Sequence, residues 1–404
     1  MTERDRSSAG QGPRATLARG NPRGMTTALG GLGPGATIGV LGGGQLGRMM
    51  AVVARQMGYR IIVLDPSPRC PTAQVSDGVV VGALDDLEAA KHLAGQVDVI
   101  TLDTEHVPAD VLTALEAIVP VRPNAAVLRT IQDRLVQKQF LDRLGLPQAA
   151  WAPVDDIHAA LAKVGRPAIL KVRRAGYDGK GQQRIGPGDD PLALLARLHG
   201  EPAVAEEVVE FTREISVILA RGLDGQIQIY PVAENVHRRH ILHTTRVPAP
   251  MPAARRAAAE AMAVSVAEAL EHVGVMAVEM FELADGRLLV NEIAPRTHNS
   301  GHYTYGACAT SQFEQHIRAV CGVPLGDPRP LTGAVMVNLI GDLWDRGPPA
   351  WHEVLARPEA RLHLYGKDAP SPGRKMGHIV LLDDDSDRAL ATAESLIATL
   401  RARS

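Results

Sequence analysis

Between residues 36 and 118, short apolar runs alternate with patterns of helical period. The apolar runs cover residues 36–41, 60–64, 79–81 and 97–102, and the helical patterns cover a stretch that ends at Met57 and residues 84–93 and 109–118. Strands and helices that alternate at this spacing predict a parallel sheet with helices on both faces. We therefore expect a Rossmann-like α/β domain over residues 36–130.

The segment before this domain has a different composition. Residues 1–35 contain five arginines among glycine and serine, and no apolar run follows these charges. This is not the pattern of a signal peptide, and it is typical of a segment that cannot bury enough apolar surface to fold. We expect residues 1–35 to form a disordered tail.

Beyond residue 130, a helical pattern over residues 131–144 ends at Gly145 and Pro147. From residue 168 onward, β-rich segments dominate, with an Ala-rich helix at 253–272 and two strands around Asp285 and Gly286. We assign residues 131–329 to an α+β domain and residues 330–404 to a small C-terminal β-rich domain that ends in a helix.

Charge and cysteine content exclude several classes of protein. Lys and Arg total 43 and Asp and Glu total 45, so there is no excess positive charge to hold a nucleic acid or an anionic membrane surface. The three cysteines, Cys70, Cys308 and Cys321, are spaced too widely for a disulfide framework or a zinc site. We expect a cytoplasmic protein that binds neither nucleic acid nor membrane, and an aromatic content of only 3% leaves few rings for stacking on bases.

A glycine-rich turn, Gly42 to Gly47, satisfies the pattern GxGxxG between a strand and a helix. The free N–H groups at such a helix N-terminus bind anions. Asp65, at the end of the next strand, could supply the acidic residue of a dinucleotide site. The pattern leaves three alternatives open, namely a dinucleotide, another phosphate and a purely structural turn.

A second glycine-rich segment follows Lys171, at the end of an apolar run. Residues 176–181 contain three glycines around Tyr177, Asp178 and Lys180, which is typical of a loop that folds over phosphates. A solvated hairpin turn is the alternative, because Asp-Gly is a common turn dipeptide.

Two glutamates are expected to face each other in the strands around Asp285 and Gly286. If these two residues form a two-residue hairpin loop, Ala284 pairs with Arg287 and Glu279 lies directly opposite Glu292. Opposed like charges destabilise a sheet unless a cation lies between them, and carboxylate oxygens favour Mg²⁺, which usually brings phosphates with it. A β-bulge that separates the two carboxylates is the alternative.

Two further loops concentrate polar groups. Residues 295–305 place Arg296, His298 and Asn299 just after Glu292, a density that packing alone does not explain. Residues 365–377 form a Pro/Gly-rich basic loop that carries Lys367, Arg374 and Lys375 and suits a phosphate or a carboxylate. A solvated run of charges is the alternative for the second loop.

Taken in order, five segments resemble the ATP-grasp superfamily, and within it the family of 5-(carboxyamino)imidazole ribonucleotide synthases of purine biosynthesis. They are GGGQLGRM at 42–49, DRLVQKQFLDRLGLP at 133–147, KVRRAGYDGKGQ at 171–182, NEIAPRTHNSGHYT at 291–304 and YGKDAPSPGRKMGHI at 365–379. The resemblance covers about residues 37–395. It implies an ATP-grasp fold in which residues 36–130 are the pre-ATP-grasp domain and about residues 150–210 are a small lid subdomain.

The resemblance also implies a reaction. ATP would phosphorylate bicarbonate to carboxyphosphate, which would carboxylate the amine of 5-aminoimidazole ribonucleotide in the pathway to IMP. The implied ligands are ATP, bicarbonate, the ribonucleotide and Mg²⁺ or Mn²⁺, and the implied assembly is a homodimer. Lys171 would meet the phosphates, Glu206 and the backbone at Val208 the adenine, and Glu214 the ribose.

The residue roles that the resemblance implies fall into four groups. The ATP site would contain Arg134, Lys171, Gly176, Tyr177, Asp178, Gly179, Lys180, Gly181, Gln182, Glu206, Glu207, Val208, Val209, Glu214, His237, Asn291 and Glu292. The catalytic group around bicarbonate and the amine would contain Tyr177, Asp178, Lys180, Arg296, His298, Asn299 and Lys367. The ribonucleotide would meet Gly44, Gln45, Leu46, Asp103, Glu105, Lys367, Arg374 and Lys375. The metal ion would be held by Glu279 and Glu292.

One segment departs from the family pattern. Where the family shows a segment like YEFENV, this chain has Leu102-Asp103-Thr104-Glu105-His106-Val107. Three alternative functions remain at this stage. They are another ATP-grasp ligase such as a formate-dependent glycinamide ribonucleotide transformylase, a nicotinamide-dependent oxidoreductase built on GxGxxG and Asp65, and an inactive nucleotide sensor.

Overall fold

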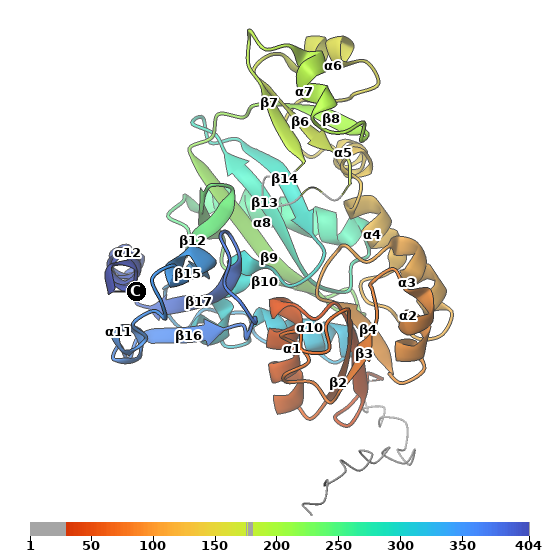
Figure 1. Cartoon of the computed structure of the whole chain (residues 1–404), viewed down its shortest axis with the longest axis vertical. Coiled ribbons are helices and arrows are strands. Elements are labelled where there is room, and N and C mark those ends of the chain that lie inside the picture. Colours follow the sequence, from red (N-terminus) through yellow and green to blue (C-terminus); the bar gives the residue numbers. More distant parts are fainter. Residues whose placement is uncertain (1–29, 175, 177–180, 404) are drawn as a thin grey trace, which may run out of the picture.

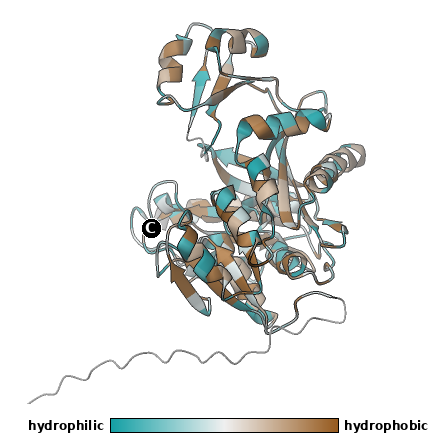
Figure 2. Ribbon diagram, turned by 90° about the vertical axis from the view of Figure 1, so that its right-hand side faces the viewer, coloured by the Kyte–Doolittle hydropathy of each residue, from teal (hydrophilic) through white to brown (hydrophobic). Residues whose placement is uncertain are grey.

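The computed structural model describes residues 30–174, 176 and 181–403, and these form three lobes (Figure 1). The smallest lobe stands apart from the other two in both ribbon views (Figures 1 and 2). No helix within the described part of the chain is both long enough and apolar enough to cross a bilayer.

The first lobe confirms the predicted parallel sheet. Its strands are β1 (Thr37–Leu41), β2 (Arg60–Asp65), β3 (Gly78–Val81) and β4 (Val99–Leu102), which pair in the order β3-β2-β1-β4. The first-lobe helices are α1 (Gln45–Gln56), α2 (Leu87–Ala94), α3 (Ala109–Glu116) and α4 (Ala125–Ile131). Side chains from α1 pack on one face of the sheet and those from α2 and α3 on the other, as expected for a parallel sheet buried on both sides.

Two boundaries of this lobe differ from the prediction. Helix α10 (Gln312–Cys321), which we had placed in the second domain, packs beside α1 and contributes Phe313, Ile317 and Val320 to the core of the first sheet. A four-stranded sheet needs more cover than α1 alone provides, so a distant segment completes the layer. Residues 30–35 are not part of a disordered tail, because the Leu32 N–H donates to Cys321 O at 2.7 Å.

The smallest lobe, which contains the predicted lid, is an antiparallel sheet with its own core. Its strands are β5 (Trp151–Pro153), β6 (Ala168–Val172), β7 (Gln182–Ile185) and β8 (Ala203–Glu207), in the order β5-β8-β6-β7. Two helices, α6 (Ile157–Val164) and α7 (Pro191–Ala196), cover it. Helix α5 (Arg134–Arg143) leads into this lobe and begins at Asp133, whose side chain accepts the Leu135 N–H.

The third lobe is built on one nine-stranded sheet, ordered β14-β13-β9-β11-β12-β15-β17-β16 with β10 added beside β9. The strands are β9 (Arg213–Arg221), β10 (Ile227–Ile229), β11 (Ala233–Arg238), β12 (Ile241–Val247), β13 (Gly274–Glu282), β14 (Leu288–Ala294), β15 (Ala334–Ile340), β16 (Ala360–Leu364) and β17 (Lys375–Leu382). Strand β12 pairs with β15, so this sheet continues across the predicted boundary between residues 329 and 330. The C-terminal segment therefore extends the central sheet.

Helices complete the packing of this sheet. The Ala-rich helix α8 (Ala253–Ala269) packs on β9 and β13, and the terminal helix α12 (Ser386–Arg403) packs on β15 and β17. The short helical elements are η1 (Asn299–Gly301), α9 (Thr304–Ala307), η2 (Gly341–Trp344) and α11 (His352–Leu355). The first two, η1 and α9, follow β14 and lie largely within the polar loop at residues 295–305.

Candidate active site

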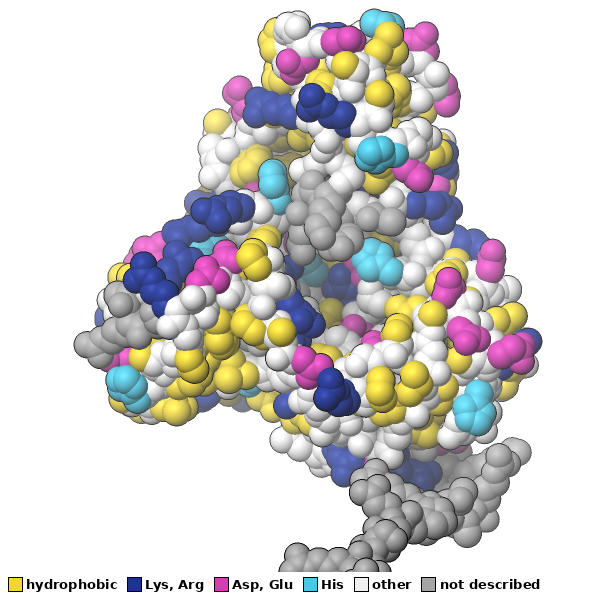
Figure 3. All heavy atoms as spheres, viewed as in Figure 1, with side chains coloured by type: hydrophobic (Ala, Val, Ile, Leu, Met, Phe, Trp, Pro, Cys, Tyr) yellow, Lys and Arg dark blue, Asp and Glu magenta, His cyan; other side chains and the backbone are white. Residues whose placement is uncertain are grey.

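The three lobes surround a hollow at the centre of the molecule (Figure 3). A cavity of about 590 Å³ lies there, and its walls come from the start of α1 and the loop after β4 in the first lobe, from β6 and β7 of the smallest lobe and from the central sheet. Many of the predicted site residues line this one cavity: Gln45, Leu46, Asp103, Glu105, Arg134, Lys171, Gly181, Gln182, Glu214, His237, Glu279, Asn291, Glu292, Arg296, His298, Asn299 and Lys375. The fold thus brings together residues that are up to 330 positions apart.

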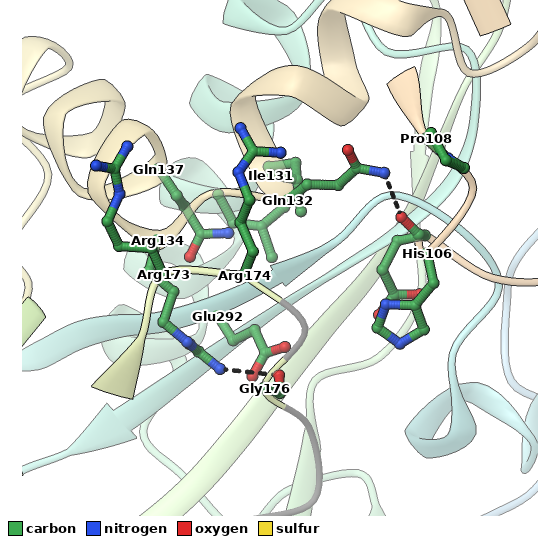
Figure 4. Close-up of a pocket in the computed structure, with 12 residues that line it drawn as sticks. His106, Pro108, Ile131, Gln132, Arg134, Gln137, Arg173, Arg174, Gly176 and Glu292 are labelled. Carbon is green, nitrogen blue, oxygen red and sulfur yellow. Dashed lines mark hydrogen bonds between the residues drawn. The ribbon is translucent and has the colours of Figure 1, made fainter. Parts of the chain in front are cut away.

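Other predicted residues lie elsewhere. Tyr177, Asp178, Gly179 and Lys180 fall outside the described residues. Gly176 lines an adjoining cavity of about 370 Å³, where its carbonyl accepts a hydrogen bond from Arg134 at 3.3 Å (Figure 4). Arg173 and Arg174 also line this second cavity, and they form ion pairs with Asp133 at 2.6 and 3.3 Å. Glu105, His106, Arg134 and Glu292 line both cavities.

Glu279 and Glu292 pair directly across β13 and β14, as predicted, but the local register differs from the prediction. The hairpin loop has three residues, because the Leu283 N–H donates to Arg287 O and Gly286 has a φ of +86°. This is the three-residue loop with a left-handed last position. The loop alone would place Glu279 opposite Asn291, but a β-bulge at Asn291 shifts the register by one residue and restores the glutamate pair.

The pair creates a strongly electronegative site. Burial and the nearby Glu292 carboxylate raise the pKa of Glu279 to about 7. The Nε2 atom of His298 lies 3.4 Å from Glu279, while His237 contacts Glu214 at 2.6 Å. Burial opposes charge on His237, but the Glu214 carboxylate outweighs it and raises the pKa of His237. Within the described ranges, no group of three or more His, Cys, Asp or Glu side chains is arranged to hold a metal ion.

The polar loop after β14 carries buried polar groups that lack a hydrogen-bond partner among the residues that the structure describes. Both side-chain atoms of Asn299 are buried, and neither has a hydrogen-bond partner among the described residues. The neighbouring imidazole of His298 contacts Ser300 Oγ through Nδ1 at 2.8 Å. Burial, and then the charge of Arg296, lower the pKa of His298 to about 3, so this imidazole is neutral at physiological pH. An unpaired amide beside a neutral imidazole suits a small polar ligand.

Arg296 is fixed by a two-pronged ion pair. Its guanidinium donates through Nε and through Nη2, the latter at 2.8 Å, to the Glu105 carboxylate on the far side of the cavity. Burial alone would raise the pKa of Glu105, but Arg296 outweighs burial and holds it at about 2. The pair ties the first lobe to the loop that carries His298 and Asn299.

Lys171 lies at the base of the smallest lobe and shares a buried carboxylate. Glu206 contacts Lys171 at 2.8 Å and Lys138 at 3.3 Å. The Val208 N–H donates to Pro167 O at 3.3 Å. Neither Glu206 nor the segment through Val209 lines the central cavity, so their assignment to the adenine site remains a prediction.

The glycine-rich turn is closed against a dinucleotide. The Gly43 N–H donates to Asp65 at 2.8 Å, and the Gly44 N–H donates to Asp103 at 3.0 Å. A Cβ on Gly43 would lie 2.1 Å from the Cys70 sulfur, so the turn is packed against this side chain, and Asp65 is already engaged by the Gly43 N–H. Asp65 therefore supports the turn. Gln45 and Leu46, the first two residues of α1, line the cavity, and N–H groups at this position have no acceptor within their own helix.

The basic loop approaches this turn from the C-terminal side. Burial, and then the charge of Arg374, lower the pKa of Lys367 to about 8, while the nearby Asp103 carboxylate opposes that shift. Neither Lys367 nor Arg374 lines the cavities, whereas Lys375 at the start of β17 lines the central one. Lys367 is thus near enough to Asp103, which holds the glycine-rich turn, to be affected by its charge, and the end of the loop reaches the cavity at Lys375.

An apolar wall of the cavity was missed in the sequence. Phe211 and Phe281 stack with ring centroids 4.6 Å apart, and Ile169 and Leu242 line the cavity with them. The alternation of β13 was the available signal, since Phe281 shares the face of Glu279. Two flat rings and two aliphatic side chains form a surface suited to a planar base.

Three family models match successive parts of the chain. They are the ribonucleotide synthetase preATP-grasp domain over residues 35–132, the ATP-grasp domain over residues 139–313 and the phosphoribosylaminoimidazole carboxylase C-terminal domain over residues 334–392. The order of domains and the contents of the cavity define an ATP-grasp ligase.

Relatives that align with most of the chain identify the family more narrowly than the three domain models do. The chain is 48% identical to N5-carboxyaminoimidazole ribonucleotide synthase of Brucella melitensis, over 86% of this chain and 96% of the relative. It is 42% identical to the synthase of that name in Bacillus subtilis, over 88% and 93%. This chain belongs to the N5-carboxyaminoimidazole ribonucleotide synthase family.

Solved structures agree with this conclusion. The Staphylococcus aureus enzyme complexed with ADP has a TM-score of 0.86 at 36% identity and covers 93% of this chain and 100% of its own. The Aspergillus clavatus enzyme in complex with ADP and 5-aminoimidazole ribonucleotide has a TM-score of 0.84 at 35% identity, with coverages of 91% and 98%.

Proposed function

We propose that this chain carboxylates the exocyclic amine of 5-aminoimidazole ribonucleotide with bicarbonate, at the expense of ATP, in purine biosynthesis. A bicarbonate oxygen attacks the γ-phosphorus, the bond to ADP breaks, and carboxyphosphate forms. The amine nitrogen then attacks the carboxyl carbon, phosphate leaves, and the amine loses a proton. The supporting observation is that opposed carboxylates, a buried unpaired amide and a helix N-terminus line one cavity.

Mg²⁺ fits the Glu279–Glu292 pair. The raised pKa of Glu279 reflects burial and then repulsion by Glu292, and a divalent cation would offset both; two carboxylates leave coordination positions for phosphate oxygens. When bound, the metal would supply positive charge to the transferring phosphoryl group, and Mn²⁺ could replace it. Lys171 and Arg134, which also line the cavity, are suited to the other phosphate oxygens.

Bicarbonate fits the polar loop after β14. Arg296 carries positive charge, Asn299 offers an unpaired amide, and neutral His298 can exchange a proton through Nε2. We assign bicarbonate and carboxyphosphate to these three residues. The sequence resemblance adds Tyr177, Asp178, Lys180 and Lys367 to this group.

The ribonucleotide phosphate fits between the glycine-rich turn and the basic loop. The N–H groups of Gln45 and Leu46 and the side chains of Lys367 and Arg374 would receive it. Asp103 and Glu105 contribute indirectly, because Asp103 holds the turn and Glu105 holds Arg296. The two stacked phenylalanines are assigned to adenine, and a homodimer is the assembly that the resemblance implies.

A three-substrate assay tests the function. We expect ADP release that requires Mg²⁺, bicarbonate and aminoimidazole ribonucleotide together, so omission of any one abolishes it. ADP formation that ignores the ribonucleotide would contradict the proposal. Formate in place of bicarbonate, with glycinamide ribonucleotide as acceptor, tests the related ligase and should give no ADP. A complete absence of turnover would instead favour the inactive nucleotide sensor.

A further inference from the structure

A side-chain hydrogen bond joins the basic loop that carries Lys367 to the first lobe. Gln74, on the segment between β2 and β3, donates from Nε2 to the carbonyl of Gly366 at 2.6 Å. Gly366 is the residue directly before Lys367. The hydrogen bond therefore acts on the backbone next to the cation that we assign to the ribonucleotide phosphate.

The amide of Gln74 is itself held in one orientation. Arg48 of α1 donates through Nη1 to Gln74 Oε1 at 2.9 Å and to the carbonyl of Pro71 at 3.0 Å. Because the arginine can only donate, the amide oxygen must face it, and the NH₂ group then faces Gly366. Arg48 belongs to the same helix as Gln45 and Leu46, which line the cavity.

The backbone at residue 366 is shaped for this contact. Gly366 has a φ of +70°, and a Cβ built there would lie 2.2 Å from Gln74 Oε1. Any side chain at 366 would therefore collide with Gln74 as well as strain the backbone. At the base of the loop, buried Tyr365 contacts His378 Nδ1 through its hydroxyl at 2.8 Å. The loop is thus fixed at its base by Tyr365 and across the lobe boundary by Gln74.

The other contact between this loop and the first lobe is longer, although both contacts lie at the exposed surface. Arg69 and Asp368 lie 3.7 Å apart, with 81% and 64% of their side chains exposed. An exposed ion pair of this kind contributes little, because solvent screens it and two long side chains must be ordered. It provides a matched control in the same interface.

We propose that Gln74 is a positioning residue that holds Lys367 over the glycine-rich turn, and so sets the affinity for the ribonucleotide phosphate. The proposal rests on the proposed function, which supplies the ribonucleotide as ligand. Gln74 does not contact the substrate in this account. It acts through the Gly366 carbonyl, and its effect must therefore disappear when Lys367 is removed.

The test compares kinetic constants of the full chain and five variants. Gln74→Leu loses every hydrogen bond of the amide, whereas Gln74→Glu keeps an acceptor for Arg48 and loses the donor to Gly366 O and the long contact, at 3.5 Å, to Arg69 O. We expect both variants to raise the KM for aminoimidazole ribonucleotide about threefold to tenfold, which is the loss of affinity expected when one or two hydrogen bonds are removed. The KM for ATP and the melting temperature should not change. Arg69→Gln, the control, should behave as the parent.

The fourth variant is the double substitution Gln74→Leu/Lys367→Ala, compared with Lys367→Ala alone. We expect the two to have the same KM for the ribonucleotide, because Gln74 acts only through Lys367. A Gln74→Glu variant with parental constants, or a full additional loss in the double variant, would overturn the proposal. A parent that shows no ribonucleotide-dependent ADP release would instead overturn the proposed function.

Discussion

Glu279 and Glu292 face each other across β13 and β14 only because a β-bulge at Asn291 compensates for a three-residue hairpin loop. Without the bulge, the one-residue slip would turn the Glu292 side chain to the opposite face of the sheet. The bulge interrupts the regular hydrogen-bond ladder of the hairpin and places two carboxylates opposite each other. Such an arrangement is expected at a cation site.

Replacing Glu292 with Gln should abolish the metal-dependent reaction without unfolding the protein. A bound metal supplies several kcal/mol of charge stabilisation, so we expect turnover to fall roughly 100-fold or more. Asp285→Asn, in the exposed turn of the same hairpin, is the control and should keep parental turnover. Steady-state ADP release and thermal melting measure both effects, and retained activity in Glu292→Gln would show that the metal assignment is wrong.

The carboxylate pair should also make stability depend on pH. The pKa of Glu279 is raised from its ordinary value of 4.5 to about 7, so the folded protein binds this proton more tightly than the unfolded chain does. The contribution of the bound Glu279 proton to the free energy of unfolding is therefore complete below pH 4.5 and is lost as the pH rises through 7.

The measurement is the melting temperature between pH 5 and 8 in the absence of divalent ions. The parent should lose stability relative to Glu279→Gln as the pH rises, and Mg²⁺ with ATP should remove the difference. Parallel curves for the parent and the variant would contradict the assigned burial and repulsion of Glu279.

Removal of the Asn299 amide should separate stability from activity. Its two buried polar atoms have no hydrogen-bond partner among the described residues, and each such group costs about 1–3 kcal/mol in the unliganded protein. We expect Asn299→Ala to lose most of its kcat/KM for bicarbonate while its melting temperature stays level or rises. Thr297→Ala, in the same loop, is a matched control. A large loss of stability in Asn299→Ala would show that the amide serves packing and not a ligand.

The Glu105–Arg296 pair should stabilise the junction between the lobes. Glu105→Gln leaves the guanidinium without its counter-charge, and breaking a buried ion pair in this way costs about 3 kcal/mol. The pKa of Glu105 is lowered to about 2, so the contribution is complete above its ordinary value of 4.5 and is lost as the pH falls toward 2. Urea unfolding at pH 7 and pH 3 checks this, because the difference between variant and parent should shrink at the lower pH. An equal difference at both pH values would argue against the pair.

Local patterns predicted most of the strands, and the family resemblance supplied most of the residues that line the cavity. Neither predicted how distant segments pack together. The parallel sheet followed from the alternation of β1 to β4, yet its need for α10 is a property of packing between segments that are far apart in the sequence. The glutamate pair was predicted from a two-residue loop, and the structure reaches the same pair through a longer loop and a bulge. Backbone hydrogen bonds decide such registers, and a single sequence does not specify them.

The glycine-rich turn shows a different limit. In the sequence, GxGxxG and Asp65 were compatible with a dinucleotide site, with another phosphate site and with a purely structural turn. Only the positions of Asp103 and Cys70, which are contributed by other segments, show that the turn is already filled. Phe211 was missed because its role depends on stacking with Phe281 from another strand.

The most direct test of the account is the fate of isotopically labelled bicarbonate. We expect ¹³C from bicarbonate to appear as a carbamate carbon on aminoimidazole ribonucleotide, with one ADP formed for each label fixed, and neither product when the ribonucleotide is omitted. ADP release without fixation of label, or fixation without ATP, would contradict the carboxyphosphate reaction proposed for this site.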